Sequence, residues 1–165
     1  VMVGHLFKEL GLTNITLKIN SLGDPQERLQ YKEILRTFLE KHSAGLCDDC
    51  RRRITTNPLR TLDCKNSQCQ NIVLMAPKII DSLSNESRTH FDEVQAGLFD
   101  ENVSFEISNH LVRGLDYYNR TVFEFVSNFG LGAQNTICGG GRYDGLFLTL
   151  GNKIDLPAIG CAGGL

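Results

Sequence analysis

The sequence has almost no net charge, no long apolar run and no repeated or low-complexity tract. A formal net charge of −2 and a pI near 6.1 exclude a globally basic nucleic-acid-binding protein, although a local basic patch is compatible with that balance. No apolar run approaches the roughly 18 to 20 residues that span a bilayer. The first stretch, VMVGHLFKEL, also lacks a basic leader with a small-residue cleavage site. We therefore expect a cytoplasmic protein with no membrane partner.

The composition, 41% hydrophobic and 22% charged over 165 residues, allows one ordinary core or two small ones. Residues 1–10 have the pattern of the end of an amphipathic helix, and the sequence stops on the glycine-rich GCAGGL. Both ends thus lie where a folded domain would be expected to continue. We expect the chain to be part of a longer protein.

Regular structure is predicted along the first part of the chain. Gly11 suits the left-handed position after the first helix, and the alternation in residues 15–19 predicts a half-buried strand. Asp24 and Pro25 are typical of a helix cap and first turn. The helix that they begin is expected to reach about residue 42. Its apolar face is predicted from these side chains: Leu29, Tyr31, Leu35, Phe38 and Leu39.

The later segments have mixed patterns. Residues 45–70 hold cysteines, arginines and a turn signal without a regular period, which predicts a loop or a small module. Residues 71–107 return to short helical patterns and end in a strand. Two further strands are expected at residues 121–126 and 134–138, joined by a glycine-bearing turn at residues 128–132.

The stretch LVRGLDYYNRTVFEF, residues 111–125, places two charges and two tyrosines beside a β-branched run. Burying Arg113 and Asp116 is costly unless other groups pair with them. The forked guanidinium of Arg113 suits phosphate or carboxylate oxygens. On a strand, Tyr117 and Tyr118 would point to opposite faces, so one of them would face a pocket. An ion pair between Arg113 and Asp116, with both tyrosines as ordinary strand residues, explains the stretch equally well.

The stretch GGGRYDGL, residues 139–146, begins with three glycines that allow positive φ and a close approach of a ligand to the backbone. It is not a Walker loop, because no Gly-Lys-Ser/Thr follows, and it lacks the spacing of a dinucleotide fingerprint. We expect it to end the preceding strand. A plain tight turn is the alternative.

Together, these two stretches resemble the two signature motifs of histidyl-tRNA synthetases, which are class II aminoacyl-tRNA synthetases. LKINSLGDPQERLQY and NPLRTLDCK are also similar to that family, so the resemblance covers most of the chain. It implies an α+β fold, in which part of the class II antiparallel sheet has flanking helices and is interrupted by a small, mainly helical insertion module. Residues 1–44 and 108–165 would be catalytic-core segments, and residues 45–107 the insertion domain.

The resemblance also implies a reaction. Histidine would be activated by ATP, with Mg²⁺, to histidyl-adenylate and then transferred to tRNA(His). The catalytic residue would be Arg113, which would contact the α-phosphate. Asp116 and Arg142 would be supporting groups, with structural pairing as the alternative. The histidine-binding residues would be these: Tyr117, Tyr118, Gly140, Gly141 and Tyr143.

General chemistry agrees with these roles. An arginine stabilises charge on phosphate oxygens, and tyrosine hydroxyls discriminate by hydrogen bonds that other amino acids leave unpaired. A homodimer is expected for the full-length protein. The family's first and second motifs lie outside these 165 residues, so we expect the chain alone to be inactive.

Four cysteines have a spacing near that of a zinc ribbon, Cys-x₂-Cys and Cys-x₄-Cys with thirteen residues between the pairs: Cys47, Cys50, Cys64 and Cys69. Six cysteines without a secretion signal favour reduced thiols or metal over disulfides. The resemblance supplies no zinc requirement, since the family includes members without these cysteines. Zinc and buried or free thiols both remain open. Cys138 and Cys161 are expected in the core.

The densest positive cluster surrounds these cysteines: Arg51, Arg52, Arg53, Arg60 and Lys65. Most such clusters are solvated faces. The resemblance implies an insertion domain that approaches the tRNA acceptor arm, so the four arginines are candidate contacts to tRNA phosphates.

Two other functions fit parts of the sequence. A catalytically silent paralogue that binds histidine and regulates histidine biosynthesis would tend to lose parts of the arginine and tyrosine signature, which is intact here. A free-standing zinc-ribbon RNA-binding module would leave both signatures unexplained. The sequence therefore predicts an enzyme of the histidyl-tRNA synthetase family.

Overall fold

A five-stranded mixed sheet forms the centre of the computed structural model, which describes residues 1–128 and 135–164. Its strands are β1 (Ile15–Ser21), β2 (Phe105–Ile107), β3 (Asn119–Ser127), β4 (Thr136–Arg142) and β5 (Ile159–Gly163). They are hydrogen-bonded in the order β2-β1-β3-β4-β5. β2 is parallel to β1, and every other pair in this order is antiparallel. The mainly antiparallel sheet agrees with the predicted α+β fold.

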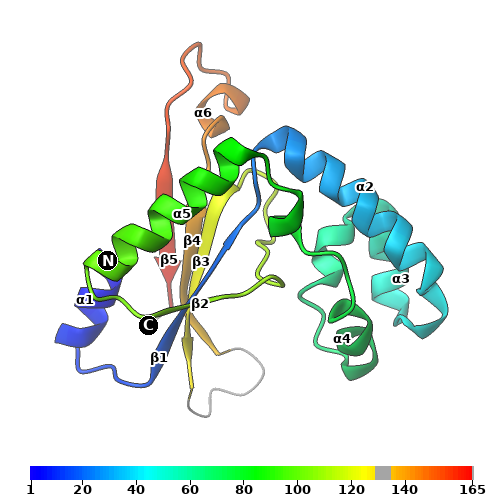
Figure 1. The fold of residues 1–165 in the computed structure, drawn as a ribbon, viewed down its shortest axis with the longest axis horizontal. Helices are drawn as coiled ribbons and strands as arrows, with labels where there is room; N and C mark the ends of the chain where they lie inside the picture. Colours follow the sequence, from blue (N-terminus) through cyan, green and yellow to red (C-terminus); the bar gives the residue numbers. More distant parts are fainter. Residues whose placement is uncertain (129–134, 165) are drawn as a thin grey trace.

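Helices lie on both sides of the sheet (Figure 1). The α-helices are α1 (Met2–Glu9), α2 (Pro25–Lys41), α3 (Asp48–Thr56), α4 (Ser67–Val73), α5 (Asn85–Asp100) and α6 (Leu146–Thr149). Short 3₁₀ helices follow α2, α3 and α4: η1 (Ser43–Gly45), η2 (Pro58–Thr61) and η3 (Ile79–Ser82). We refer to residues 43–82, which hold α3, α4 and these 3₁₀ helices, as the helical module. No helix in the described residues is long and apolar enough to cross a membrane.

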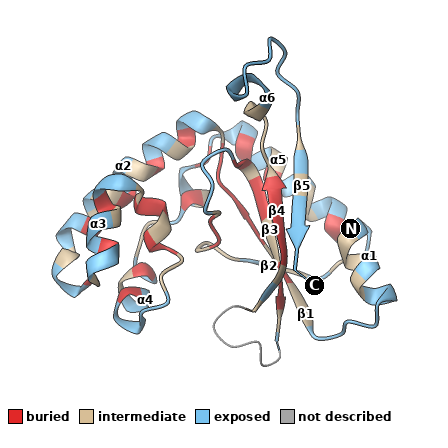
Figure 2. Ribbon diagram, turned by 180° about the vertical axis from the view of Figure 1, so that it is seen from behind, coloured by how far each residue is buried: buried red, intermediate tan, exposed pale blue. Residues whose placement is uncertain are grey.

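The two sides of the sheet have separate apolar cores. Phe91 and Leu98 of α5 pack with Leu17 and Phe125 on one face, and α1 adds partly buried side chains there. Val122 belongs to the other core, which it shares with α2 and the helical module. Figure 2 shows this burial in the central strands and on the inner sides of α2, α3 and α4. The sheet therefore separates α5 from the helical module.

The predicted start of α2 is confirmed in detail. The Asp24 side chain accepts a hydrogen bond from the Glu27 backbone N–H, and the Glu27 side chain accepts one from the Asp24 N–H, forming a capping box with Pro25 in the first turn. Gly11 has the predicted positive φ, at 72°. The predicted apolar face is wrong at Leu29, which is 62% exposed. Glu27 is buried on the covered side of α2 instead, because a hydrogen-bond network satisfies it.

Of the two alternatives for residues 45–70, the structure shows the small module, since α3, η2 and most of α4 fold within them around a common core. Another prediction needs correction. The glycines at the start of GGGRYDGL do not end the strand, because residues 139–141 lie inside β4 and pair with β3. Glycine suits this strand because its neighbours approach closely, as described below. The turn predicted at residues 128–132 lies, apart from its first residue, outside the described residues.

Candidate functional site

Arg113 lies in the segment that leads into β3, and three neighbours hold its guanidinium. Its Nη1 atom lies 2.5 Å from Glu124 Oε1, and both side chains are largely buried. Glu124 is itself oriented by a 3.1 Å hydrogen bond from Thr136 Oγ1. The guanidinium carbon of Arg113 lies 5.7 Å from the centre of the Tyr118 ring, within the range of a cation–π contact. The Nε atom of Arg113 is buried and has no hydrogen-bond partner among the described residues. The arginine is thus held in place, and Nη1 is the only one of its guanidinium nitrogens with a hydrogen-bond partner among the described residues.

Gly139 makes this position of Arg113 possible. A Cβ added at Gly139 would lie 2.5 Å from Arg113 Nη1 and 3.0 Å from its Cζ atom, so any side chain would collide with the guanidinium. Gly139 is paired with Glu124 across β3 and β4. The glycine and the carboxylate therefore form the surface on which Arg113 rests.

Three tyrosines form one cluster next to Arg113. The ring centroids of Tyr117 and Tyr118 are 4.6 Å apart, and Tyr143 lies 5.7 Å from Tyr117 and 6.1 Å from Tyr118. A hydrogen bond with Tyr118, together with burial, raises the pKa of Tyr117. The expectation that Tyr117 and Tyr118 alternate on a strand is wrong, because β3 begins at Asn119 and the two rings lie against each other.

The predicted glycines lie beside this cluster in different ways. A Cβ on Gly141 would lie 3.0 Å from the Tyr118 ring and 2.8 Å from the Thr121 carbonyl oxygen. One on Gly140 would collide with the Gly160 carbonyl oxygen of β5 instead. Gly141 thus lies against Tyr118, whereas Gly140 lies against the β5 backbone.

The two predicted supporting residues pair with other groups than Arg113. The Asp116 carboxylate lies 3.4 Å from Lys32 Nζ, and its carbonyl oxygen accepts a hydrogen bond from Arg28. The alternative ion pair between Arg113 and Asp116 is therefore wrong. Arg142 Nε lies 2.5 Å from Asp144 Oδ2. The structure thus ties Asp116 to α2 and ties Arg142 to the turn after β4.

A cavity of about 770 Å³ opens beside Arg113. The sheet supplies one wall of this cavity through Lys18, Glu124 and Thr136, and the helical module supplies another through residues 62–65. Arg113 is one of the residues that line the cavity. Glu124 was missed in the sequence, although a carboxylate inside the apolar strand TVFEFV was a signal for it. Gly139 was noted as part of the glycine run, but its position beside Arg113 was not predicted.

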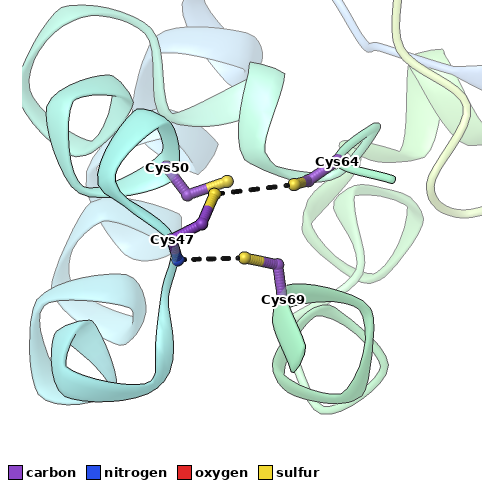
Figure 3. Close-up of side chains that lie close together, drawn as sticks. All are labelled: Cys47, Cys50, Cys64 and Cys69. Carbon is purple, nitrogen blue, oxygen red and sulfur yellow. Dashed lines mark hydrogen bonds between the residues drawn. The ribbon is translucent and has the colours of Figure 1, made fainter. Parts of the chain in front are cut away.

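The four predicted cysteines lie together, as Figure 3 shows. Their sulfur atoms all lie within 4.8 Å of one another. Cys47 precedes α3 and Cys50 lies in its first turn, whereas Cys64 follows η2 and Cys69 belongs to α4. The Cys47 N–H donates a 3.2 Å hydrogen bond to Cys69 Sγ, and the sulfur atoms of Cys47 and Cys64 are 3.9 Å apart.

The cysteines differ in environment. A hydrogen bond from the Cys50 backbone lowers the pKa of the Cys47 thiol to about 7. Burial raises the pKa values of Cys50 and Cys69. Outside the cluster, Cys138 is buried in the core as expected, but Cys161 is exposed, so the core prediction for it is wrong.

The candidate tRNA-binding arginines are exposed to different degrees, and all are paired. Arg51 and Arg52 form ion pairs with Asp48 and Asp49 on the surface of α3. Arg53 and Arg60 both approach Asp63, at 3.9 Å and 3.3 Å. These aspartates reduce the positive potential that the sequence suggested.

Besides its ion pair with Asp63, Arg60 lies near the segment that carries Arg113. A Cβ on Gly114 would lie 2.7 Å from Arg60 Nη1, so Arg60 lies against the residue that follows Arg113. The helical module therefore touches the segment that carries the catalytic candidate.

Sequence comparisons point to one kind of relative. No protein-family model matches the chain. The histidine–tRNA ligase of Methylobacillus flagellatus is 49% identical over 165 residues, which cover 99% of this chain and 39% of the ligase. That of Bordetella avium is 50% identical over 165 residues, which cover 100% of this chain and 38% of the ligase. The chain thus spans less than half the length of the curated relatives it matches.

Solved structures share the fold. The apo histidyl-tRNA synthetase of S. aureus matches with a TM-score of 0.71 and 37% identity, over 98% of this chain and 39% of that one. A Bacillus halodurans C structure named as an ATP phosphoribosyltransferase regulatory subunit/histidyl-tRNA synthetase has a TM-score of 0.56 at 20% identity, over 97% of this chain and 44% of that one, and shows likeness of fold alone. The predicted class II fold is confirmed. Along its length, this chain is therefore homologous to a segment of the histidine–tRNA ligases.

Proposed function

We propose that the protein containing this chain is a histidine–tRNA ligase, which activates histidine with ATP and Mg²⁺ and transfers it to tRNA(His). The observation that carries the proposal is Arg113, which Glu124, Gly139 and Tyr118 hold in the lining of a large cavity. A guanidinium fixed at a cavity suits an anionic group such as the α-phosphate of ATP.

The chemistry needs such a group. The carboxylate of histidine attacks the α-phosphorus, and the protein contributes mainly by positioning the reactants and stabilising charge on phosphate oxygens. Arg113 would stabilise the negative charge that develops there, without any proton transfer. Glu124 would keep the guanidinium oriented, because its carboxylate accepts a hydrogen bond from Nη1.

The tyrosine cluster would recognise the histidine. Tyr118 and Tyr143 lie within one group of rings next to Arg113, close enough for an amino acid to contact both. Their hydroxyl groups can donate or accept a hydrogen bond, which suits the two nitrogens of an imidazole. Tyr117 and Gly141 would complete the pocket, and Gly140 would support it by packing against β5.

The wider proposal follows the relatives. Residues 1–44 and 108–165 would be catalytic-core segments and residues 45–107 an insertion domain, whose arginines would contact tRNA. The whole protein would form a homodimer and act in the cytoplasm, where it would supply charged tRNA for translation. A regulatory protein that binds histidine without catalysis is the alternative. It is less favoured because the relatives near 49% identity are named as ligases, while the regulatory-subunit structure is 20% identical.

Histidine-dependent exchange of pyrophosphate into ATP tests this proposal in the natural full-length protein that contains the sequence. Replacing Arg113 with alanine should lower the exchange rate at least about a hundredfold, the usual scale for losing one charge-stabilising donor. Arg88→Ala is the matched control, because the Arg88 side chain makes a single hydrogen bond to the Ile80 carbonyl oxygen on the outside of α5.

The outcomes separate the alternatives. Absence of exchange in the wild-type protein, with histidine still bound, would support the regulatory alternative. Normal exchange in Arg113→Ala would remove the role of Arg113 while leaving the enzyme assignment intact.

A further inference from the structure

The cysteine cluster in the helical module has no part in the proposed chemistry. Four thiols from three separate segments converge until all four sulfur atoms lie within 4.8 Å of one another. Apolar packing alone would not require four sulfur atoms at one point, since thiols pack as small apolar groups anywhere in a core. The convergence therefore needs its own explanation.

We propose that Cys47, Cys50, Cys64 and Cys69 bind one Zn²⁺ ion as a structural tetrathiolate site. Zinc with four thiolates at about 2.3 Å is tetrahedral, which places the sulfur atoms about 3.8 Å apart. The Cys47 and Cys64 sulfur atoms are 3.9 Å apart, and the remaining pairs need only small movements. An iron–sulfur cluster fits less well, because its iron and sulfide atoms would hold the thiolates further apart.

The surroundings suit a negatively charged metal centre. Four thiolates and one Zn²⁺ carry a net charge of −2. The hollow beside Cys47 and Cys64 is lined by three basic and two acidic side chains: Arg53, Arg60, Lys65, Asp49 and Asp63. The Cys47 N–H already donates to Cys69 Sγ, an arrangement typical of backbone groups that stabilise bound thiolates. The basic side chains thus exceed the acidic ones by one around this hollow, and one backbone donor already contacts a sulfur atom.

The module also needs a cross-link. α3 has nine residues and α4 has seven, and helices this short are not stable alone in water. No strand of the described chain lies within the helical module, so it has no hydrogen-bonded ladder to tie its segments together. A metal bound to both helices and to the segment after η2 would supply that connection.

The metal would also shape the candidate site. Cys64 and its neighbours Asp63 and Lys65 line the 770 Å³ cavity that holds Arg113. Arg60, which is paired with Asp63, lies against Gly114. Zinc would thus fix one wall of the cavity without touching substrate, and this consequence rests on the proposed function.

The direct test is the metal content of untagged natural full-length protein, purified without chelator and measured by elemental analysis. We expect about one zinc per chain in the wild-type protein and in Cys161→Ser, the control in which an exposed cysteine outside the cluster is replaced. Cys64→Ser should retain less than about a fifth of that zinc. Equal zinc in Cys64→Ser and the wild type, iron in place of zinc, or no metal in the wild type would overturn the proposal.

A second measurement needs no variant, so it remains decisive if Cys64→Ser fails to fold. Removing zinc from the wild-type protein with a thiol-binding mercurial should release one zinc as four thiols react, and a chelator should then speed amide hydrogen exchange in residues 43–75 at least about tenfold. Exchange in β1 and β3 should change little. A similar increase in exchange rate throughout the chain, or no increase in the helical module, would contradict a local structural metal. These readouts do not depend on catalysis, so they can succeed even if the proposed function fails.

Discussion

The sheet side of the molecule and the helical module keep their functional side chains in place by different means. Arg113 rests on β3 and β4, whose backbone hydrogen bonds fix Glu124 and Gly139 opposite each other. The cysteines lie on short helices that no ladder connects. Position on the sheet is set by strand register, whereas position in the module depends on side-chain packing and, in our proposal, on a metal ion. The sheet site should therefore survive perturbations that loosen the module.

Glu27 connects two helices that pack on opposite faces of the sheet. It lies in the first turn of α2, and it accepts hydrogen bonds from the Ser84 N–H and the Ser87 hydroxyl, each at 2.6 Å, at the start of α5. One carboxylate thus connects the helix beside the module with the helix that covers the other face of the sheet.

The largest effect is expected from Glu27→Gln, which breaks this connection. Burial alone would raise the pKa of Glu27, but hydrogen bonds from Ser84, Ser87 and Asp24 lower it to about 2. The ionised form therefore stabilises the folded state by about 3 kcal/mol above pH 5, and this contribution is lost as the pH falls from about 4.5 to 2. Urea unfolding at pH 7 should show a loss of similar size in Glu27→Gln.

The matched control for Glu27 is Glu33→Gln on the same helix, where the carboxylate is exposed and pairs with Arg36. Its free energy of unfolding should change by less than about 0.5 kcal/mol. A loss of unfolding free energy in Glu27→Gln that is as large near pH 2 as at pH 7 would contradict the assigned pKa, because most of the ionised form's contribution should be gone at pH 2.

The next largest effect is expected from a change in the sheet alone, at Gly139. Gly139→Ala places a Cβ against the Arg113 guanidinium and must displace it, so pyrophosphate exchange should fall about tenfold or more with little loss of secondary structure. Gly97→Ala in α5 is the control, since an added Cβ meets no atom within 4 Å there. Unchanged exchange in Gly139→Ala would mean that the position of Arg113 is not what the reaction needs.

A smaller effect, on the KM for histidine, is expected when tyrosines of the candidate site are replaced. Tyr118→Phe and Tyr143→Phe should each raise the KM for histidine about fivefold and the KM for ATP less than twofold, because each removes a single hydroxyl from the proposed amino-acid pocket. Tyr31→Phe removes a buried hydroxyl that donates to the Pro77 carbonyl oxygen in the helical module, so it should lower stability without changing either KM. Equal changes for both substrates in Tyr118→Phe would contradict the assignment to histidine.

Local signals predicted the elements that depend on a few adjacent residues. Asp24 and Pro25 fix the start of α2 whatever surrounds it, and the alternation of residues 15–19 required a strand with one covered face. Leu29 shows the limit of such patterns, because the covered side of α2 is set by neighbours that are distant in sequence. On the covered side of α2 lies Glu27 rather than Leu29, and the hydrogen-bond partners of Glu27 are 57 and 60 residues away.

The candidate site likewise has features that adjacent residues indicate and features that depend on residues distant in sequence. The resemblance indicated Arg113 and the tyrosines, but the partner of Arg113 was wrong because the register of β3 against β4 is not local information. Glu124 and Gly139 become neighbours only through that register. The cysteine spacing, by contrast, left a metal site and separate thiols both open, and the cluster in the structure is compatible with the first.

The smallest effect concerns the proposed tRNA contacts of the helical module. Arg52 is the most exposed of the four arginines, and its ion pair with Asp49 competes with any contact to phosphate. Arg52→Ala should therefore weaken aminoacylation of tRNA only about threefold and leave pyrophosphate exchange, which needs no tRNA, unchanged. Asp49→Ala should act in the opposite direction, because it frees Arg52, and both effects should shrink as salt is raised. An identical loss in exchange and aminoacylation for Arg52→Ala would show that the module supports the catalytic site rather than tRNA, and would remove the functional division between the two regions.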